Sequence, residues 1–446
     1  MTLQVMTAPA PERRVSGDPL ELLLKGTYPD PQTGAAVGVR TRGLVIADSL
    51  AGMEAGLVAD LGFGKRLTLV SDPTTHGVLG VRVEAALAGR YAVQSLVLPA
   101  DVVPDDATVA RLRAASGLAD AFIAVGSGTI NDLVKYASAL ERKPYAVFGT
   151  APSMNGYVSL TASITVGGHK STLPAQAPAG AFFDIGVLAA APPRMIRAGL
   201  GDSLCRTTAQ ADWLLSHLLF DTPYRELPFA LLAADEPQLF DRAGELLGGS
   251  LEAMRILART LVLSGFGTAI VGSSAPASQG EHLVSHYIDM LEPPGRPPVF
   301  HGEQVGVTTL SLARLQHAML DVRPVVHLDI ENEPSIRRRF GDELGGSVWE
   351  EFSQKRLDRA GAEALNRRIA AGWDAIREKI AAVLLPVGRM EAVLAAAGAP
   401  MIPADIHLER GFYQSALRHG REIRNRYTML DLAAASGRLE SSLVTI

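Results

Sequence analysis

Short hydrophobic runs alternate with longer amphipathic segments through the first third of the chain. Helical spacing of hydrophobic positions appears at residues 77–90 and 129–140, and Asp105 and Asp106 are typical of a helix start. The strand-like runs occupy residues 67–70, 93–98, 121–125 and 145–148. Because short, continuously hydrophobic strands joined by helices are typical of βαβ units, this pattern predicts a parallel sheet covered by helices on both faces.

Further along the chain strand-like runs nearly vanish and helical spacing dominates. Long segments rich in Ala and Leu occupy residues 201–220, 243–264, 280–290, 305–319 and 362–384. The pattern changes beside Pro192 and Pro193, which would end an element there. We therefore expect a mobile N-terminal tail over residues 1–25, a Rossmann-like nucleotide-binding α/β domain over 26–192 and an all-helical domain over 193–446. A cleft between two such domains is a common place for a binding site.

Composition and charge narrow the classes of partner. The 446-residue chain has a formal net charge of −5, and this balance argues against a nucleic-acid partner. No uncharged hydrophobic run reaches about 18 residues, so a membrane partner is not expected. The single cysteine, Cys205, excludes an intrachain disulfide and suits a reducing cytoplasm. We interpret Cys205 as a small core residue rather than a nucleophile.

A glycine turn between a strand and a helix is the first candidate for ligand chemistry. Gly126, Ser127 and Gly128 follow the third strand-like run, and Thr129 opens the helical segment behind it. Glycines in such a turn let the backbone approach a pyrophosphate, and the helix start offers free N–H groups. Asn131 stands where the usual third glycine would be, and tight turns also use glycine for steric reasons alone.

Two polar residues are expected at the same edge of the sheet as this turn. Asp72 follows the first strand-like run and Thr150 follows the fourth, and the carboxyl ends of parallel strands share one edge. A carboxylate at Asp72 would bind ribose hydroxyls and disfavour a 2′-phosphate. This gives a weak preference for NAD over NADP.

Three residues in separate segments form a candidate metal site. Asp202 lies at the start of a helical segment, His282 lies one turn before His286, and His301 follows a proline-rich loop. One carboxylate and two imidazoles suit zinc, nickel or iron, and three protein ligands leave positions open for a substrate. The alternative is structural, with Asp202 as a helix N-cap and the histidines as core or surface residues. Spacing alone leaves both interpretations open.

The motifs around these residues follow one another in a distinctive order. They are GSGTIND at 126–132, TAPSMNGY at 150–157, GDSL at 201–204, GSSAPASQGEHLVSH at 272–286, HGEQV at 301–305 and RNRYTMLD at 424–431. Over about residues 45–435 the chain resembles the superfamily of metal-dependent polyol and alcohol dehydrogenases that includes glycerol dehydrogenase and dehydroquinate synthase. Within that superfamily the motifs are most similar to the bacterial sn-glycerol-1-phosphate dehydrogenase branch.

This resemblance implies a dehydroquinate synthase-like fold and a homodimer. It implies a nicotinamide cofactor, NAD(H) or NADP(H), and one divalent ion held by Asp202, His282 and His301. The iron-dependent branch carries a further histidine one turn after the aspartate, where this chain has Arg206, so we expect zinc or nickel rather than iron. The reaction implied is reduction of dihydroxyacetone phosphate to sn-glycerol 1-phosphate. The implied cofactor-binding residues are Asp72, Gly126, Ser127, Gly128, Thr129, Asp132, Thr150 and Ser153.

Other residues near these motifs receive roles in substrate handling. His286 is expected to transfer a proton or bind the substrate, with a core histidine as the alternative. Lys170 is expected to contact phosphate or cofactor, with a solvated surface lysine as the alternative. Glu281 and Glu303 each flank a candidate ligand and are expected to orient it.

Two positions depart from the pattern of the resembled branch. Asn155 stands where an aspartate is usual, and an amide can hydrogen-bond a substrate but cannot act as a base. Ala275 stands where an arginine is frequent, and its loss removes a cation from the cleft. The alternatives are therefore a diverged member that acts on another ketone, polyol or sugar phosphate, a cyclase that uses NAD transiently, and an inactive binding protein on the same fold.

Overall fold

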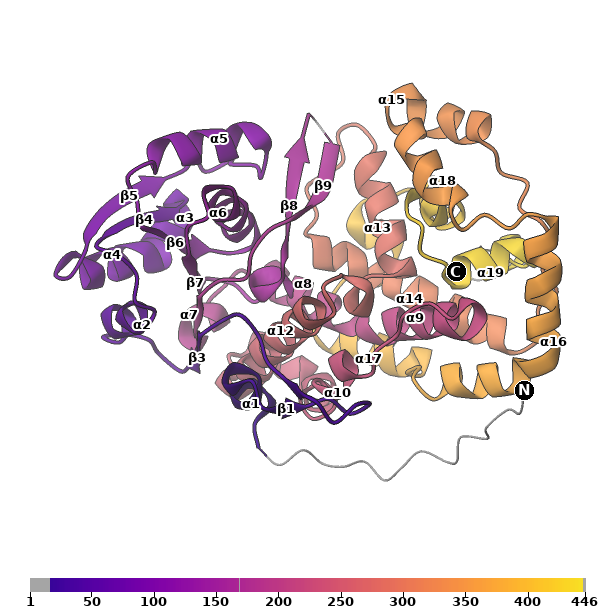
Figure 1. The fold of residues 1–446 in the computed structure, drawn as a ribbon, viewed down its shortest axis with the longest axis horizontal. Helices are drawn as coiled ribbons and strands as arrows, with labels where there is room; N and C mark the ends of the chain where they lie inside the picture. The colour runs from indigo at the N-terminus through magenta and orange to yellow at the C-terminus, as the bar shows by residue number, and fades with distance from the viewer. Residues whose placement is uncertain (1–16, 168, 444–446) are drawn as a thin grey trace.

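The computed structural model describes residues 17–167 and 169–443 and has two parts (Figure 1). The first is built on a parallel sheet of six strands in the order β3-β10-β7-β6-β4-β5. These strands are Gly43–Ala47 (β3), Arg66–Ser71 (β4), Ala92–Val97 (β5), Ala121–Gly126 (β6), Tyr145–Gly149 (β7) and Gly180–Asp184 (β10). The four expected strands are confirmed as β4, β5, β6 and β7, whereas β3 and β10 were not predicted.

Helices cover both faces of this sheet, as the hydrophobic pattern predicted. In the central strand β6, Phe122 and Ala124 pack into one hydrophobic cluster, and Ile123 and Val125 pack into another on the opposite face. The helices are Glu54–Asp60 (α2), Pro73–Thr75 (α3), Val81–Ala88 (α4), Asp106–Ala115 (α5), Gly128–Glu141 (α6) and Ile185–Ala189 (α7). The helix expected at 77–90 begins differently, because a π-helical turn at His76–Gly80 joins α3 to α4.

The second part of the molecule is helical. Its longer helices are Pro193–Leu204 (α8), Arg206–Phe220 (α9), Leu251–Val271 (α12), Gly280–Met290 (α13), His301–Leu320 (α14), Glu333–Ser353 (α15), Arg359–Ala381 (α16), Val387–Ala396 (α17) and Arg410–His419 (α18). Shorter helices are Leu227–Ala230 (α10), Asp235–Asp241 (α11), Met429–Ala435 (α19) and Leu439–Leu443 (α20), and 3-10 turns occupy Ala243–Gly248, Ala275–Ala277, Pro403–Ile406 and Gly420–Ile423. A further 3-10 turn, Gly156–Val158, lies in the first part, after β7. The segment expected as one helix over 201–220 is two helices, separated at Cys205.

Helix α12 lies where the helical part meets the sheet domain, since it contacts α7 and β3 as well as α8, α10 and α11. It is long and apolar enough to meet a composition test for a membrane span, but 67% of the relevant window is buried inside the protein. Residues such as Leu257, Leu261 and Phe266 are fully or almost fully buried in the main hydrophobic cluster. Burial among protein side chains accounts for the apolar composition of α12.

The N-terminal segment corrects the predicted tail. Helix α1, Pro19–Lys25, is capped by the Asp18 side chain and buries Leu23 completely. Strands Tyr28–Pro29 (β1) and Ala36–Val37 (β2) follow, and Figure 1 shows this segment beside α10 and α12. Arg259 of α12 donates to Asp18 at 2.9 Å. The expectation of a tail through residue 25 is therefore wrong for residues 17–25, and residues up to about 37 pack on helices assigned to the second domain.

A hairpin that was not predicted stands between the two parts. It consists of Thr161–Val166 (β8) and His169–Pro174 (β9), which pair in antiparallel fashion beside α13 (Figure 1). The sheet domain anchors it, because the Thr165 N–H donates to the Pro104 carbonyl at 2.7 Å. The Ser163 N–H donates to the Asp132 carboxylate at 2.9 Å. The hairpin thus extends the α/β domain toward the helical one.

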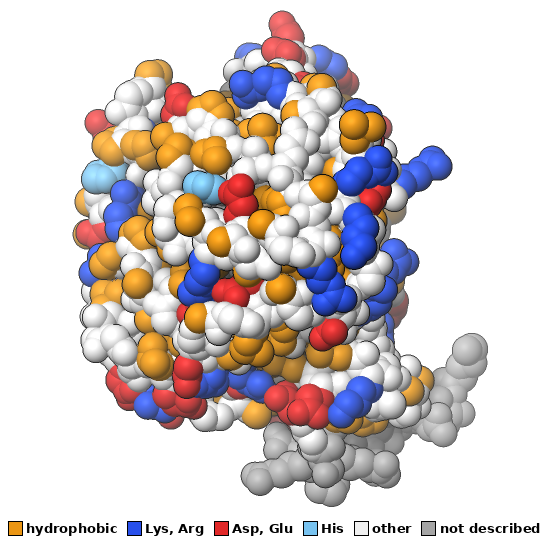
Figure 2. All heavy atoms as spheres, turned by 90° about the vertical axis from the view of Figure 1, so that its left-hand side faces the viewer, with side chains coloured by type: hydrophobic (Ala, Val, Ile, Leu, Met, Phe, Trp, Pro, Cys, Tyr) orange, Lys and Arg blue, Asp and Glu red, His pale blue; other side chains and the backbone are white. Residues whose placement is uncertain are grey.

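The outer face of the α/β domain mixes all classes of side chain. Figure 2 views the molecule from the left-hand side of Figure 1, where α4 and β5 lie. Basic side chains gather along the right-hand margin of this view, and acidic and hydrophobic side chains are scattered over the rest of the face. This mixture matches a chain whose net charge is only −5.

Candidate active site

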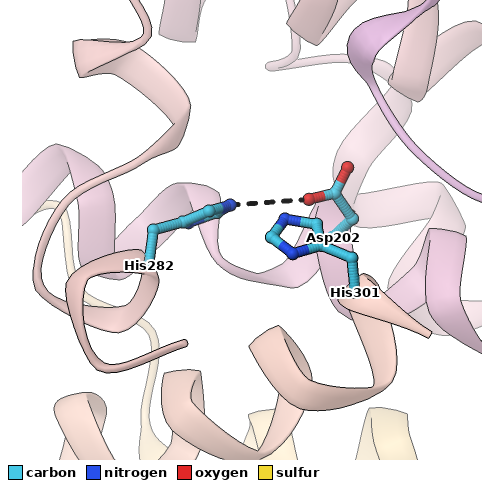
Figure 3. A group of neighbouring side chains, drawn as sticks. All are labelled: Asp202, His282 and His301. Atoms are coloured by element: carbon cyan, nitrogen blue, oxygen red, sulfur yellow. Dashed lines mark ion pairs between the residues drawn. The ribbon is translucent and has the colours of Figure 1, made fainter. Parts of the chain in front are cut away.

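Three helices bring the predicted metal ligands together. Asp202 lies near the end of α8, His282 is the third residue of α13, and His301 is the first residue of α14. Figure 3 shows their side chains pointing toward one another. One potential ligand atom from each residue lies within 4.8 Å of the others. The packing of the three helices therefore brings together the three candidate ligands, whose proximity the sequence spacing alone could not establish.

Asp202 is held in place by the loop that follows β7. The backbone N–H of Asn155 donates to Asp202 Oδ2 at 2.8 Å. The other oxygen, Oδ1, faces His282 Nε2 at 3.8 Å. Asp202 is only 3% exposed, and burial raises the pKa of its carboxyl group while His282 opposes that shift. A carboxylate buried in this way is stabilised when a cation lies beside it.

A buried glutamate orients His282. Glu281 Oε1 lies 2.9 Å from His282 Nδ1 and also accepts the Gln279 N–H at 2.8 Å. Glu281 Oε2 accepts the Thr208 hydroxyl at 3.2 Å. A carboxylate on Nδ1 fixes the histidine tautomer and leaves Nε2 free to bind a metal. The geometry supports the orienting role expected for Glu281.

Glu303 fixes the beginning of α14. Its carboxylate accepts the Phe300 N–H at 3.0 Å and two guanidinium N–H groups of Arg194, at 2.9 and 2.7 Å. Arg194 belongs to the first turn of α8, the helix that carries Asp202. This ion pair therefore connects α8, which carries Asp202, to the first turn of α14, which carries His301.

The donor set fits a divalent transition metal. Donors held at about 2.1 Å from one zinc ion lie roughly 3–4 Å from each other, so small side-chain rotations bring the triad into reach. The His282 Nε2 to Asp202 Oδ1 distance of 3.8 Å already falls in that range. The composition of one carboxylate and two imidazoles matches open catalytic sites.

His286 borders the same space. Its ring centroid lies 6.0 Å from those of His282 and His301, and it stacks on the His301 ring at an interplanar angle of 18°. Arg206 lies elsewhere: its guanidinium pairs with Glu236 and donates to Gln210 Oε1. The position one turn after Asp202 therefore holds a side chain that is engaged away from the triad.

The structure describes the surroundings of Ala275 but not the side chain of Lys170. The Lys170 backbone belongs to β9, but the Lys170 side chain lies outside the described residues, so its expected role is untested. Ala275 lies in the 3-10 turn before α13. Arg426, from the C-terminal motif, reaches this turn and donates to Ser274 Oγ at 2.8 Å. Burial lowers the pKa of Arg426 to about 10.

The glycine turn lies at the topological switch point of the sheet, where successive strands are added on opposite sides of β4. From β4 the chain proceeds outward to β5 and then returns to the other side of β4 as β6. Ligands of such sheets bind outside the carboxyl ends of the strands at this reversal. Gly126 ends β6, and a Cβ there would lie 2.5 Å from the Ile130 side chain, so close packing requires glycine. Ser127 makes no side-chain capping bond, and α6 begins at Gly128.

The other expected cofactor residues surround this turn. The Thr150 N–H donates to the Gly126 carbonyl at 3.1 Å, which places Thr150 directly beside the turn. Asp72 caps α3 through the Thr75 N–H at 2.9 Å. Asp132 accepts the Ser163 N–H on one oxygen and faces Lys135 on the other. Ser153 follows Thr150 in the same loop. Roles for these residues, and for Thr129 in the first turn of α6, stay predictions.

Two buried charged residues near the site were missed. Lys135 of α6 is completely buried, and its three-residue spacing from Asp132 was the available clue. Asp212 of α9 accepts N–H groups from Gly280 of α13, from Met429 of α19 and from the Gln316 side chain of α14. Burial, together with Glu281, raises the pKa of Asp212 to about 7. Nothing in the local sequence marks Asp212 as buried.

A cavity of about 490 Å³ opens next to His301. Thr165 of the β8–β9 hairpin lines one side of it, and Arg296 and Gln304 of the helical part line the other. This volume is in the range of small-molecule sites. Arg296 is itself held by hydrogen bonds to the Ile406 carbonyl and to Gln304 Oε1.

Comparison with known proteins agrees with this geometry. A family model described as iron-containing alcohol dehydrogenase matches residues 45–192. Glycerol-1-phosphate dehydrogenase [NAD(P)+] of Geobacillus stearothermophilus is 31% identical over 380 residues, covering 82% of this chain and 86% of the relative. The Bacillus subtilis (strain 168) protein of the same name is 29% identical over 320 residues, covering 70% and 80%.

Solved structures share the fold at low sequence identity. A probable glycerol dehydrogenase from Sinorhizobium meliloti 1021 aligns with a TM-score of 0.55 at 18% identity, over 89% of this chain and 96% of that one. A 1,3-propanediol oxidoreductase aligns with a TM-score of 0.60 at 14% identity, over 90% and 98%. These matches confirm the expected fold class. The 31% identity over most of both chains shows that the protein belongs to the glycerol-1-phosphate dehydrogenase family.

Proposed function

We propose that this protein is an NAD(P)H-dependent dehydrogenase that reduces dihydroxyacetone phosphate to sn-glycerol 1-phosphate, and catalyses the reverse reaction. The observation that carries the proposal is the convergence of Asp202, His282 and His301, of which His301 also lines the cavity bordered by Thr165 of the β8–β9 hairpin. The names of the relatives at 31% and 29% identity supply the substrate and the cofactor class.

Asp202, His282 and His301 would hold one divalent metal ion. A metal ion bound there supplies Lewis-acid polarisation of the substrate oxygen, which favours hydride movement at the adjacent carbon. The protein keeps its ligands oriented through the Asn155 N–H on Asp202 and the Glu281 carboxylate on His282. His286, whose ring lies near those of His282 and His301, would exchange a proton with the substrate oxygen.

Zinc or nickel fits this site better than iron. The position one turn after Asp202 is Arg206, whose guanidinium pairs with Glu236. Two imidazoles and one carboxylate then form a three-ligand set, which is typical of catalytic zinc. Metal analysis of protein purified without added metal, followed by reconstitution with zinc, nickel or iron, tests this assignment.

The nicotinamide cofactor is proposed to bind at the carboxyl edge of the sheet. The start of α6, at Gly128, would meet the pyrophosphate, because free N–H groups and the helix dipole favour an anion there. Asp72 would accept the ribose hydroxyls, and its charge would oppose a 2′-phosphate. NADH is therefore expected to bind more tightly than NADPH, and titration with both cofactors measures the ratio.

The decisive experiment compares related substrates. NADH oxidation is followed with zinc-loaded protein and dihydroxyacetone phosphate, dihydroxyacetone or glyceraldehyde 3-phosphate. The proposal expects the highest kcat/KM with dihydroxyacetone phosphate and a chiral product identified as sn-glycerol 1-phosphate. Failure of zinc- and nickel-loaded protein to turn over dihydroxyacetone phosphate would overturn it.

One observation favours a second candidate function. Asn155 cannot act as a base, and its side-chain amide donates to Ser264 Oγ at 3.3 Å. A diverged member acting on another ketone, polyol or sugar phosphate is the corresponding alternative, and a wider panel of carbonyl compounds tests it.

A dehydroquinate synthase-like cyclase would show no net consumption of NADH. A homodimer in the cytoplasm is proposed from the same family membership, and sedimentation of the purified protein tests the dimer.

A further inference from the structure

A completely buried lysine on the predicted cofactor helix contacts the chain segment that follows Asn155, the residue whose N–H donates to Asp202. Lys135 is on α6, two turns after the glycine turn, and its side chain has no exposed surface. Lysine is almost never fully buried unless its ammonium group is paired. An uncharged side chain would fill the same space without the cost of desolvating a charge. The charge therefore calls for an explanation beyond packing.

The Lys135 ammonium group binds one short stretch of chain. It donates to the Gly156 carbonyl at 2.5 Å, to the Thr161 carbonyl at 3.0 Å and to Ser159 Oγ at 3.2 Å. Asp132, one turn earlier on α6, faces it at 3.4 Å. The three donors of the ammonium group thus fix both ends of the segment 156–161.

The residue immediately before this segment holds a metal ligand. The Asn155 N–H donates to Asp202 Oδ2 at 2.8 Å. On the other side the segment is confined by α12, because a Cβ on Gly265 would lie only 2.4 Å from the Asn155 carbonyl oxygen. The backbone at Asn155 is therefore set by Lys135 on one side and by α12 on the other, and the position of its N–H sets the orientation of the Asp202 carboxylate.

We propose that Lys135 is a positioning residue for the metal site, which it serves by fixing the segment 156–161 and thereby the Asn155 N–H that orients Asp202. The inference rests on the metal site proposed above and adds a residue that does not touch the ion. Loss of the ammonium group leaves the chain between β7 and β8 free to shift. Asp202 then loses its fixed partner, and the affinity for metal falls even though the three ligands are intact.

The test measures zinc affinity by competition with a fluorescent chelator, independently of turnover. Lys135→Met keeps most of the buried volume and removes all three donors. We expect zinc to bind about 10- to 100-fold more weakly, the range found when partners of metal ligands are removed. The matched control is Lys143→Met, because Lys143 donates to the Ser116 and Gly117 carbonyls at 3.2 and 3.1 Å in the same domain, away from this segment. The control should keep wild-type zinc affinity.

Chemical rescue separates positioning from general destabilisation. Lys135→Ala leaves a cavity that n-propylammonium fills with an ammonium group, whereas n-propanol fills it with a single hydroxyl donor. Zinc affinity should recover with the ammonium ion and not with the alcohol. If Lys135→Met unfolds, Ser159→Ala tests whether the segment 156–161 sets zinc affinity, because it removes one acceptor of Lys135 and also the contacts of the Ser159 hydroxyl with the Gly156 and Thr161 carbonyls at 3.0 Å. Zinc should then bind at least about two- to tenfold more weakly, the value of one hydrogen bond.

The outcomes distinguish this inference from the proposed function. Wild-type protein that binds no zinc would contradict the metal site itself. Wild-type protein that binds zinc, with folded Lys135→Met, or failing that Ser159→Ala, binding it equally well, would overturn the role of Lys135 alone.

Discussion

Gly201 and Gly302 are in direct backbone contact where α8 and α14 cross. A Cβ on Gly201 would lie 2.1 Å from the Gly302 carbonyl oxygen, and a Cβ on Gly302 would lie 1.9 Å from the Ala198 carbonyl oxygen. Each glycine is the immediate neighbour of a candidate metal ligand, Asp202 in one helix and His301 in the other. The absence of side chains at this crossing therefore sets how closely the two ligands approach.

Gly201→Ala is expected to separate the two helices. Because the added methyl group meets backbone rather than a flexible side chain, we expect a loss of about 1–3 kcal/mol in the free energy of unfolding. We also expect zinc affinity to fall by at least about tenfold, since both ligands move with their helices. Urea denaturation and chelator competition measure the two effects.

Gly306→Ala is the matched control for that change. A Cβ on Gly306 would lie 3.5 Å from the Gly201 Cα, which is an ordinary contact, so zinc affinity should stay at the wild-type value. Equal zinc affinity in Gly201→Ala, Gly306→Ala and wild-type protein would show that the crossing does not set the ligand geometry.

Removal of either imidazole should abolish metal binding. His282→Ala and His301→Ala each leave two of the three proposed ligands, and we expect near-zero metal after dialysis and a fall in kcat/KM of at least about 1000-fold. His317→Ala serves as control, because His317 lies on α14 but bonds the Leu385 carbonyl. Both imidazole variants retaining stoichiometric metal would refute the triad.

Glu281→Gln tests the partner of His282. The amide keeps an acceptor for His282 Nδ1 but loses the charge that strengthens this hydrogen bond, and partners of this kind are worth about 10- to 100-fold in metal affinity. Zinc affinity should fall by about tenfold, while thermal unfolding of the metal-free protein changes less. An unchanged zinc affinity would mean that Glu281 serves packing alone.

Asp212 predicts a dependence of stability on pH. Its folded-state pKa of about 7 lies above the ordinary aspartate value of 3.8, so the folded protein binds one more proton than the unfolded chain between these values. Its contribution to stability is fully present below about pH 4 and falls by about 1.4 kcal/mol per pH unit until the pH passes about 7. Asp212→Asn cannot titrate and should reduce this slope between pH 5 and 7.

The measurement for Asp212 is the urea midpoint at several pH values. The Gly280 and Met429 N–H groups donate to different oxygens of Asp212, and asparagine keeps only one acceptor oxygen, so the variant is expected to be less stable at every pH. The comparison between wild-type protein and Asp212→Asn therefore concerns how steeply the urea midpoint changes with pH and not the absolute urea midpoint. Parallel slopes for wild-type and Asp212→Asn would contradict the raised pKa.

Asn155→Asp introduces a carboxylate where the resemblance to the family predicts one. If a missing base limits turnover, kcat with dihydroxyacetone phosphate should rise at least about tenfold, and the pH profile should gain a limb from the new carboxylate. Asn155→Ala is the control, since it removes the amide without adding a base. No increase in kcat for Asn155→Asp would show that Asn155 is suited to the reaction as it stands.

The most accurate predictions from the sequence concern segments in which a clear hydrophobic pattern or a specific motif is present. Strands β4 to β7 are continuous hydrophobic runs with flanking turns, and the metal triad lies in motifs whose order is specific. The β8–β9 hairpin was readable in principle, since Gly167 and Gly168 separate two segments rich in Thr and Ser, and paired glycines favour a hairpin turn. Asp18 followed by Pro19 likewise marked the start of α1.

Other features depend on tertiary contacts that no local pattern records. Lys135 and Asp212 occupy helix positions that an exposed residue would occupy equally well in an isolated helix. Only the packing of α6 against the 156–161 segment, and of α9 against α13, α14 and α19, buries them. The break at Cys205 between α8 and α9 is similar, because hydrophobic spacing continues across it.

The N-terminal segment gives the α/β domain a second covalent attachment. The chain leaves the helical part after β2, enters the sheet at β3, and returns to the helical part between β10 and α8. Arg225 pairs with Asp30 at 2.5 Å, which anchors the first of these attachments on the helical side. Two covalent connections restrict the movement of the two parts relative to each other more than a single linker would.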